Sequence, residues 1–228
     1  MTCEGCGQLF LSQALWVFGR AGFWQRHCTV CMSREKEAAA AQREKEADAA
    51  RESIWMEVCP VIYRDTNPSD SRLDRAAVQA AQEWPVRSAR GLAFVGPTGR
   101  GKTRCLFLAL RRAHSAGSST AAISHNRFSK AVVGAFAGDA DDKARSKALL
   151  RRLAVVDVLL LDDLGKAPST ERVDAELEEI VETRTSVGLP ILWSANGSGQ
   201  WLMNRFGPDR GEPLVRRLSE FCEVQSVR

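Results

Sequence analysis

The sequence has 228 residues, of which 44% are hydrophobic and 26% charged, and its formal net charge is +4. A chain of this length and composition can bury a globular core, which argues against a disordered protein. The slight basic excess permits a nucleic-acid partner but does not indicate one by itself. We therefore expect one main domain with an appendage.

The sequence shows no sign of export or membrane insertion. Its apolar runs stay well below the roughly 18 residues that a membrane span requires. The apolar stretch 9–19 lacks a basic leader and begins beyond two cysteines, so it does not fit an export signal. Seven cysteines, an odd number, then point to a reducing compartment. We expect a soluble, cytoplasmic protein without membrane contact.

Four cysteines of the first 33 residues form two pairs, Cys3 with Cys6 and Cys28 with Cys31. The pattern C-x2-C…C-x2-C, with 21 residues between the pairs, lies slightly beyond the usual spacing of ribbon-type zinc sites. It predicts a tetrahedral Zn²⁺ site of four thiolates. Disulfide bonds are the alternative use, which is rare in the cytoplasm. His27 is not required as a ligand because four thiolates complete the site.

The segment between the cysteine pairs has more aromatic residues than so small a module can bury. We expect some of them to cover the metal and others to form a partner-binding patch. DNA contact is the rival interpretation, but the segment has only Arg20 and Arg26 as permanent cations. The aromatic residues are Phe10, Trp16, Phe18, Phe23 and Trp24.

Residues 34–53 consist almost entirely of strong helix formers, with alanine as the only apolar type. Such a helix has no stripe that could face a core. The pattern predicts a charged helical linker over 34–57, between a zinc-binding module at 1–33 and a larger domain at 58–228. The linker is either a neutral spacer or an element whose length sets the reach of the module.

From residue 58 onward, short apolar runs alternate with amphipathic helical stretches. One such helix is predicted over 170–187, with Val173, Leu177, Ile180 and Val181 on one face. Strands that alternate with helices predict an α/β fold with a five-stranded parallel sheet covered on both faces. Ligands bind such sheets at the carboxyl ends of the strands. The predicted strands are 92–95, 121–124, 158–161, 191–194 and 222–227.

The segment GPTGRGKT (96–103) follows a predicted strand, opens a predicted helix, and matches G-x-x-x-x-G-K-[ST]. Lys102 is expected to bridge the β- and γ-phosphates of a nucleotide, and the Thr103 hydroxyl to bind Mg²⁺. A glycine-rich turn with an incidental lysine is the weaker alternative. The loop that would surround the phosphates with backbone N–H groups consists of Gly96, Pro97, Thr98, Gly99, Arg100 and Gly101.

The segment VLLLDDLG (158–165) places two carboxylates at the end of an apolar strand. Asp162 is expected to hold Mg²⁺ through its water shell, and Asp163 to orient and polarise the attacking water. A turn-capping role would explain one aspartate better than two. Because Asp163 is one methylene shorter than glutamate, we expect slow, switch-like hydrolysis.

Residues 58–228 resemble AAA+ ATPases, which are P-loop NTPases, and among them the DnaC/DnaI-type helicase loaders and the IstB-type transposition helper ATPases. The resemblance covers about three quarters of the chain and implies ATP and Mg²⁺ as ligands. It rests on these segments in order: CPVIYRD (59–65), GLAFVGPTGRGKT, VDVLLLDDLG, LPILWSAN (189–196) and GEPLVRRLSEFCEV (211–224).

The resemblance also assigns roles to single residues. Asn196 corresponds to the sensor-1 residue that reads the γ-phosphate, although Ser194 and Ala195 replace the usual Thr-Ser before it. Arg217 corresponds to the arginine finger that reaches a neighbouring subunit, with Arg216 as a possible substitute, so the active species should be an oligomer. An exposed surface arginine is the alternative. The short sequence after the last strand implies that a full C-terminal lid is lacking.

A basic helix is expected within 141–157, just before the acidic strand. The family context implies contact with single-stranded DNA, whereas the residues alone fit a solvated surface helix better. Cys59, Cys105 and Cys222 lie in or near core segments and are interpreted as small buried apolar residues. The basic residues of the helix are Lys143, Arg145, Lys147, Arg151 and Arg152.

Three functions follow in order of preference. The first is an ATP-dependent loader that binds a replicative ring helicase through the zinc module, engages single-stranded DNA as an oligomer, and releases on hydrolysis. The second is an IstB-like ATPase that regulates a transposase on duplex DNA. The third, a metabolic P-loop kinase, leaves the sensor and finger motifs unexplained.

Overall fold

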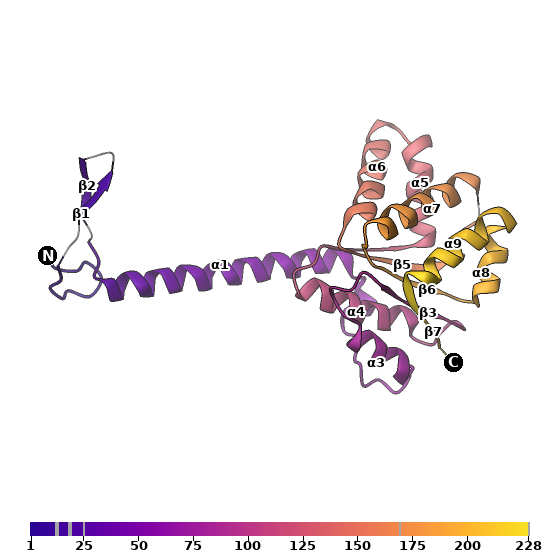
Figure 1. The fold of residues 1–228 in the computed structure, drawn as a ribbon, viewed down its shortest axis with the longest axis horizontal. Helices are drawn as coiled ribbons and strands as arrows, with labels where there is room; N and C mark the ends of the chain where they lie inside the picture. The colour runs from indigo at the N-terminus through magenta and orange to yellow at the C-terminus, as the bar shows by residue number, and fades with distance from the viewer. Residues whose placement is uncertain (12–13, 18–19, 25, 169, 228) are drawn as a thin grey trace. The chain divides into compact units, whose positions relative to one another are not determined.

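The structure is a computed structural model that describes residues 1–11, 14–17, 20–24, 26–168 and 170–227, with the side chains of 14–17, 20–24, 208 and 209 left out. The chain divides into two compact units, Met1–Ser53 and Ile54–Arg228 (Figure 1). The second unit therefore begins within the range predicted as linker. Among the described residues, no helix combines the length and apolar character that a bilayer span requires.

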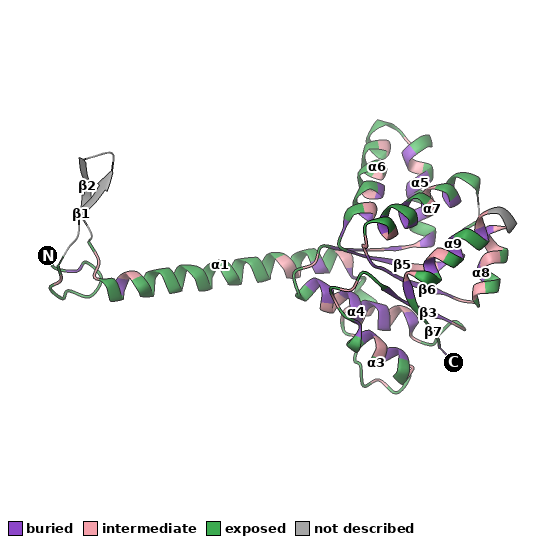
Figure 2. Cartoon of the chain, viewed as in Figure 1, coloured by how far each residue is buried: buried purple, intermediate pink, exposed green. Residues whose placement is uncertain are grey.

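The first unit contains a small hairpin, four cysteines and most of a long helix. Strand β1 (Ala14–Val17) pairs antiparallel with β2 (Arg20–Trp24). Helix α1 (Thr29–Val58) starts before the predicted linker and includes Cys31 in its first turn. Most of its surface is exposed, as the green ribbon in Figure 2 shows, because its sequence provides no apolar stripe.

The second unit is built on a five-stranded parallel sheet, which confirms the predicted fold class. The strand order is β4-β5-β6-β3-β7, so the central strands β5, β6 and β3 have neighbours on both sides. All residues of β3 and β6 are buried, as expected when helices cover both faces. The strands are β3 (Gly91–Val95), β4 (Thr120–Ser124), β5 (Val158–Leu164), β6 (Ile191–Ala195) and β7 (Cys222–Ser226).

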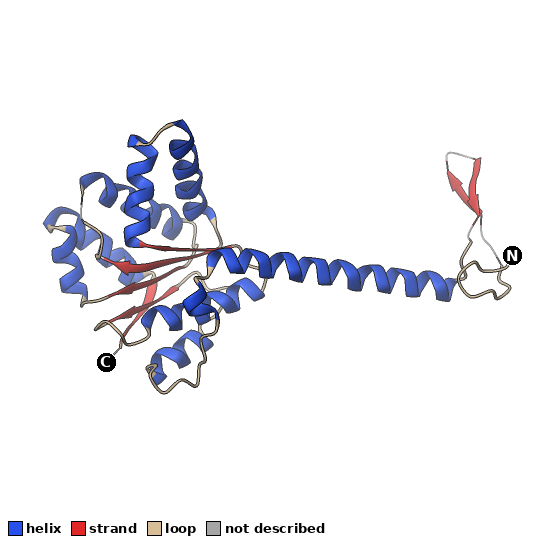
Figure 3. Ribbon diagram, turned by 180° about the vertical axis from the view of Figure 1, so that it is seen from behind, coloured by secondary structure: helices blue, strands red, loops and turns tan. Residues whose placement is uncertain are grey.

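Helices pack on the two faces of the sheet and form two apolar cores (Figure 3). One core lies under α3 and α4 and includes Trp55, at the end of α1. The other lies under the remaining long helices. The helices of this unit are α2 (Val61–Arg64), α3 (Arg75–Glu83), α4 (Lys102–Ser115), α5 (His125–Ala137), α6 (Ala140–Val155), α7 (Glu171–Ser186), α8 (Gly199–Phe206) and α9 (Pro208–Glu220).

Helix α7 buries the four residues predicted to share a face, Val173, Leu177, Ile180 and Val181. The three cysteines interpreted as apolar core residues are buried as well. Burial raises the pKa of the Cys59 thiol to about 11 and those of Cys105 and Cys222 to about 12, so all three stay protonated at neutral pH.

Candidate nucleotide-binding site

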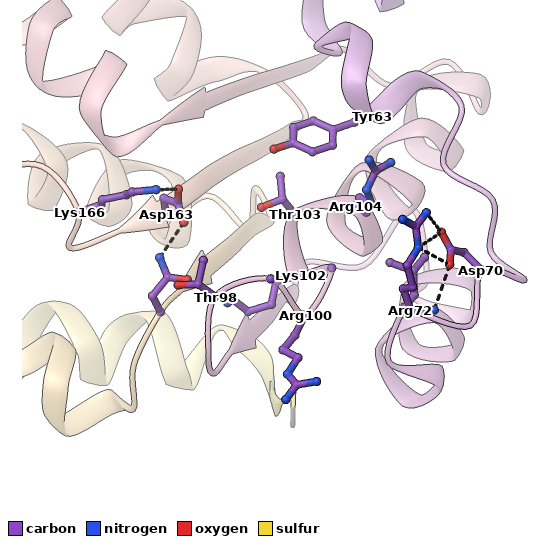
Figure 4. Close-up of a pocket in the computed structure, with 14 residues that line it drawn as sticks. Tyr63, Asp70, Arg72, Thr98, Arg100, Lys102, Thr103, Arg104, Asp163 and Lys166 are labelled. Atoms are coloured by element: carbon purple, nitrogen blue, oxygen red, sulfur yellow. Dashed lines mark hydrogen bonds and ion pairs between the residues drawn. The ribbon is translucent and has the colours of Figure 1, made fainter.

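A cavity of about 390 Å³ lies at the carboxyl end of the central strands (Figure 4). The loop after β3, the ends of β5 and β6, and the segment before α3 all contribute to its lining. This position matches the rule for ligand sites in parallel sheets. The lining residues are Tyr63, Asp70, Arg72, Leu73, Thr98, Gly99, Arg100, Gly101, Lys102, Thr103, Arg104, Asp163, Lys166 and Asn196.

The loop after β3 depends on glycine at two positions. Gly96 and Gly101 have φ angles of 139° and 78°, which side-chain-bearing residues rarely adopt. A Cβ atom on Gly96 would lie 2.2 Å from the carbonyl oxygen of Val227, and one on Gly101 would lie 2.4 Å from Leu73. The loop leads directly into α4, whose N-terminal N–H groups and dipole favour a bound anion.

The ammonium group of Lys102 is held inside the protein. Its Nζ donates to the carbonyl oxygens of Gly96 and Pro97 at 2.9 and 2.8 Å and to Asn196 Oδ1 at 2.9 Å. The residue is 5% exposed, and burial lowers the pKa of its ammonium group. These contacts direct the cation to the loop, where a phosphate would replace them.

Asp162 lies where a magnesium ion is expected. Its Oδ1 accepts hydrogen bonds from Thr103 Oγ1 at 2.8 Å and from Ser194 Oγ at 2.7 Å. Burial raises the pKa of Asp162, and the two hydroxyl donors partly offset that shift. A carboxylate and a hydroxyl at this separation form the hard oxygen donor set that Mg²⁺ prefers, so these residues fit the ion.

Asp163 sits at an irregularity of the sheet. The register between β5 and β6 shifts between Leu161 and Leu164, and Asp163 has a φ of 57°, rare for a residue other than glycine. Its N–H donates to Ser194 Oγ at 2.9 Å. Backbone strain of this kind concentrates at functional sites, and here it accompanies a carboxylate in the pocket lining.

Both oxygens of the Asp163 carboxylate accept a hydrogen bond. Oδ1 accepts from Asn196 Nδ2 at 3.0 Å, and Oδ2 accepts from Lys166 Nζ at 2.8 Å. Sequence reasoning missed Lys166, although its place three residues after Asp163 was visible. It also passed over the hydroxyl of Ser194, which it treated only as a departure from the family pattern.

The structure brings most of the predicted nucleotide-site residues together. Thr98 to Thr103, Asp163 and Asn196 line the cavity, while Gly96 and Pro97 contact Lys102 through their carbonyl groups.

Arg217 lies elsewhere, on α9, outside this chain's own cavity lining. Its guanidinium pairs with Glu182 at 3.3 Å, and its side chain is 37% exposed. Arg216 is exposed. Neither arginine therefore acts on this chain's own pocket in the conformation seen here.

The segment before α3 and the first turn of α4 add lining residues to which sequence reasoning gave no role; of these, only Tyr63 belongs to a segment used as a family marker. The Tyr63 ring stacks on Phe107 at 4.9 Å, and the Arg104 guanidinium lies 5.7 Å from the centre of the Tyr63 ring. Asp70 accepts hydrogen bonds from the Arg72 side chain, which lower the pKa of the Asp70 carboxyl to about 2. In Figure 4 Arg104, Arg72 and Asp70 lie on the side of the loop away from Asp163 and Lys166.

The four N-terminal cysteines form a second candidate site. Their sulfur atoms all lie within 4.8 Å of one another, and the Cys6 and Cys28 sulfurs are 3.8 Å apart. A tetrahedral zinc ion with Zn–S bonds of about 2.3 Å requires sulfurs roughly 3.8 Å apart, so the set fits the ion. A Cβ atom on Gly5 would lie 3.1 Å from the Cys31 sulfur.

Hydrogen bonding favours a thiolate at Cys3, whereas hydrogen bonds with Cys6, Cys28 and Cys3 raise the pKa of Cys31 to about 12. The backbone N–H of Cys28 donates to the Cys3 sulfur at 3.2 Å, which lowers the pKa of Cys3 to about 6. His27 bonds to Glu35 at 2.5 Å. Of the aromatic residues in this unit, only Phe10 has a described side chain; those of Trp16, Phe18, Phe23 and Trp24 lie outside the described residues.

The predicted basic helix is α6, and several of its cations face solvent. Lys147, Arg151 and Arg152 are exposed, and Arg152 donates to the carbonyl oxygen of Thr120 at 3.4 Å. Arg145 pairs with Asp142 on the same helix.

The sheet order, the loop and the acidic strand end define a P-loop protein of the AAA+ type that binds a nucleoside triphosphate. Residues 33–228 match the family model of the IstB-like ATP binding proteins, and the chain belongs to this family. The comparison with curated proteins finds no match.

Three solved structures share the fold. The DnaC helicase loader has a TM-score of 0.59 and 18% identity, over 74% of this chain and 100% of that one. DnaI has a TM-score of 0.58 and 19% identity, over 75% of this chain and 92% of that one. AMPPCP-bound DnaA from Aquifex aeolicus has a TM-score of 0.54 and 22% identity, over 68% of this chain and 45% of that one. The chain therefore spans less than half of the DnaA chain that it matches. At these identities the likeness shows the fold.

Proposed function

We propose that this protein is an ATPase that loads a replicative ring helicase onto single-stranded DNA. The observation that carries the ATPase part is a chain of hydrogen bonds of 2.7–3.0 Å at one edge of the sheet. It runs from Lys102 through Asn196 to Asp163, and through Ser194 to Asp162 and Thr103. Membership of an ATP-binding family supports the same assignment.

Each residue has a role in this proposal. The loop 96–101 and Lys102 bind the phosphates, and Asn196 reads the terminal phosphate through its position between Lys102 and Asp163. Thr103 and Asp162 hold Mg²⁺, which neutralises charge on the phosphate oxygens when it is bound. Asp163 orients and polarises the attacking water. The short aspartate and its two hydrogen bonds favour slow, switch-like turnover.

Self-association completes the site. Arg217 is partly exposed on α9 and, among the described residues, its guanidinium forms a surface ion pair with Glu182, which contributes little stability. A planar, permanent cation suits the charge that spreads over the phosphoryl oxygens in the transition state. We assign Arg217 to the pocket of a neighbouring subunit.

The remaining parts are assigned to partners. Residues 1–33 form a zinc-binding module that contacts the helicase, residues 34–57 a charged helical linker, and residues 58–228 the AAA+ domain. The exposed cations of α6 contact single-stranded DNA. The fold likeness to the DnaC helicase loader, over 74% of this chain and 100% of that one, supports a loader role for the AAA+ domain.

A second function is favoured by one observation, the match to the IstB-like family over 33–228. In that case the same ATPase would regulate a transposase on duplex DNA. The four-cysteine unit fits this alternative less well, because most of it lies before the matched residues.

A loading assay separates the two functions. The full-length protein, the replicative helicase of the same organism, Mg²⁺-ATP and a circular single-stranded DNA are mixed, and helicase retained on the DNA is measured. A circle has no ends, so a closed ring must open to bind it. We expect retention with the wild type and its loss in Lys102→Ala and in Cys3→Ser/Cys6→Ser. ATP-dependent capture of a transposase on duplex DNA, without helicase retention, would support the alternative.

A further inference from the structure

Lys166 is a second lysine at the pocket, and the proposed function gives it no role. It follows β5 directly after Gly165, lines the cavity, and is 53% exposed. Its Nζ lies 2.8 Å from Asp163 Oδ2, and the hydrogen bond to this carboxylate raises the pKa of the lysine. The charge is therefore always present, and the side chain borders solvent.

Two distant side chains fix the backbone around Lys166. The N–H groups of Gly165 and Ala167 both lie 3.2 Å from His125 Nδ1. Arg205 on α8 donates to the carbonyl oxygens of the same two residues at 2.8 and 2.7 Å. The polar backbone groups on both sides of Lys166 are thus satisfied by α5 and α8, so the half-exposed lysine side chain extends from a backbone that two helices hold.

The acceptor role of His125 requires a neutral imidazole, because a protonated ring cannot accept through Nδ1. His125 is 2% exposed, and burial together with the nearby Arg205 cation lowers its pKa to about 4. The ring is therefore neutral at physiological pH, and its Nδ1 can accept the hydrogen bonds from the N–H groups of Gly165 and Ala167.

The two lysines of the pocket differ in how firmly the protein holds their ammonium groups. Lys102 is buried and directed at the phosphate loop by three protein acceptors. Among the residues that the structure describes, Lys166 has one carboxylate partner, and that partner is the residue expected to polarise water. While the ion pair lasts, Oδ2 of Asp163 is occupied, as Oδ1 is by Asn196.

We propose that Lys166 determines specificity for triphosphates: its ammonium group neutralises Asp163 when the pocket lacks a terminal phosphate and moves to that phosphate when a nucleoside triphosphate binds. The move frees Oδ2 of Asp163 for the attacking water. A diphosphate offers no terminal phosphate, so the ion pair with Asp163 persists. This inference rests on the proposed nucleotide site.

The test compares Lys166→Met and Lys166→Arg with the wild type in the full chain. Affinities for the non-hydrolysable analogue AMPPCP and for ADP, both with Mg²⁺, are measured by calorimetry. Loss of one charge-assisted contact should weaken AMPPCP binding by about tenfold in the Met variant, with ADP affinity changed by less than about twofold. The Arg variant should recover most of the AMPPCP affinity. Lys45→Met, on the exposed part of α1, is the matched charge control.

Other outcomes have definite meanings. Equal loss for both nucleotides, or no loss for either, would overturn the inference. An unchanged AMPPCP affinity with a higher kcat would show that Lys166 only restrains Asp163, which also overturns it. The proposed function is judged separately, because it requires that the wild type bind AMPPCP and that Lys102→Ala abolish this binding, whatever Lys166→Met does.

Discussion

The cysteine cluster and the nucleotide pocket are both encoded by short motifs, but different forces hold their residues in place. The pocket residues stand at the ends of buried strands, and apolar cores on both faces of the sheet fix those strands. In the first unit, Cys3 and Cys31 are the only buried residues among the side chains that the structure describes. Apolar packing thus supports the nucleotide pocket, whereas a bound metal would hold the cysteine cluster together.

This contrast suggests that the two sites respond differently when their ligands are removed. A nucleotide pocket supported by a packed sheet keeps its geometry when empty. A module whose described side chains form no apolar core gains folding free energy from the metal, which in zinc-binding peptides amounts to about 10–16 kcal/mol. Four predictions, from the largest expected effect to the smallest, test this difference and the assignments that depend on it.

Removing the metal should unfold the first unit alone. In Cys3→Ser/Cys6→Ser, or after chelation of the wild type, we expect amides of residues 1–28 to exchange hydrogen at nearly unfolded rates, while 58–227 remain protected. Hydrogen-exchange mass spectrometry measures both regions in one sample, and elemental analysis should show one zinc per untreated chain. Re-addition of zinc to the chelated wild type is the control. Protection of 1–28 in protein proven to be metal-free would contradict the contrast.

Arg217→Ala should abolish most hydrolysis without affecting binding. Arginine fingers contribute about 10³-fold or more to kcat, so we expect a loss of about that size with unchanged ATP affinity. Steady-state kinetics and calorimetry measure the two quantities. Glu182→Ala, which breaks the same ion pair from the other side, should leave kcat nearly unchanged. A parallel loss of ATP affinity and kcat would show that Arg217 supports the fold. If Arg216→Ala, and not Arg217→Ala, loses hydrolysis, Arg216 is the arginine finger.

Acid should destabilise the second unit through His125. The folded-state pKa is about 4, against an ordinary value of 6.5, so the unfolded state binds the proton more readily. The stability that depends on a neutral His125 is fully present above pH 6.5 and is lost as pH falls toward 4, by about 3 kcal/mol. Urea unfolding at pH 7 and pH 4.5 measures the change.

The matched variant for this prediction is His125→Asn, whose Oδ1 can accept from the same N–H groups and does not titrate. It should be less stable at pH 7 but show a flatter dependence on pH. If the wild type and the variant lose the same stability between the two pH values, other groups cause the acid sensitivity.

Replacing Arg151 and Arg152 with alanine should have the smallest effect. If both contact phosphates, single-stranded DNA binding weakens, and the slope of log K against log salt concentration decreases by about 1.4, since each contact contributes about 0.7. Fluorescence anisotropy over a salt series measures this. Arg34→Ala/Arg43→Ala, with the same change of charge on the exposed surface of α1, is the control. If the affinity for single-stranded DNA and its salt dependence are unchanged, α6 is a solvated surface helix that does not contact DNA.

The sequence alone predicted most elements of the second unit, because they are determined by local features such as apolar runs and short motifs. The five strands lie within a few residues of the predicted apolar runs. In the loop 96–103, the glycines themselves indicate a backbone that requires positive φ angles. The cysteine spacing likewise predicted the grouping of the four sulfurs. The zinc ion itself and the role of Arg217 stay predictions, since each needs a ligand or a second subunit.

The missed residues depend on long-range geometry. Lys166 reaches Asp163 because Asp163 adopts a left-handed conformation within an irregular strand, which no propensity indicates. His125 and Arg205 meet the loop from about 40 positions away on either side, so only the folded chain reveals them. The start of α1 was missed by five residues because Cys31, a metal-ligand candidate, also belongs to its first turn.

The most direct test of the central claim is a mixing experiment with two inactive variants. Asp163→Asn has a defective pocket and an intact Arg217, while Arg217→Ala has an intact pocket and no finger. Each is expected to bind ATP and to hydrolyse almost none alone, and an equimolar mixture should recover hydrolysis at mixed subunit boundaries. If both variants are folded and bind ATP but the mixture stays inactive, the pocket is not completed by a neighbour's Arg217, and the account of an oligomeric ATPase fails.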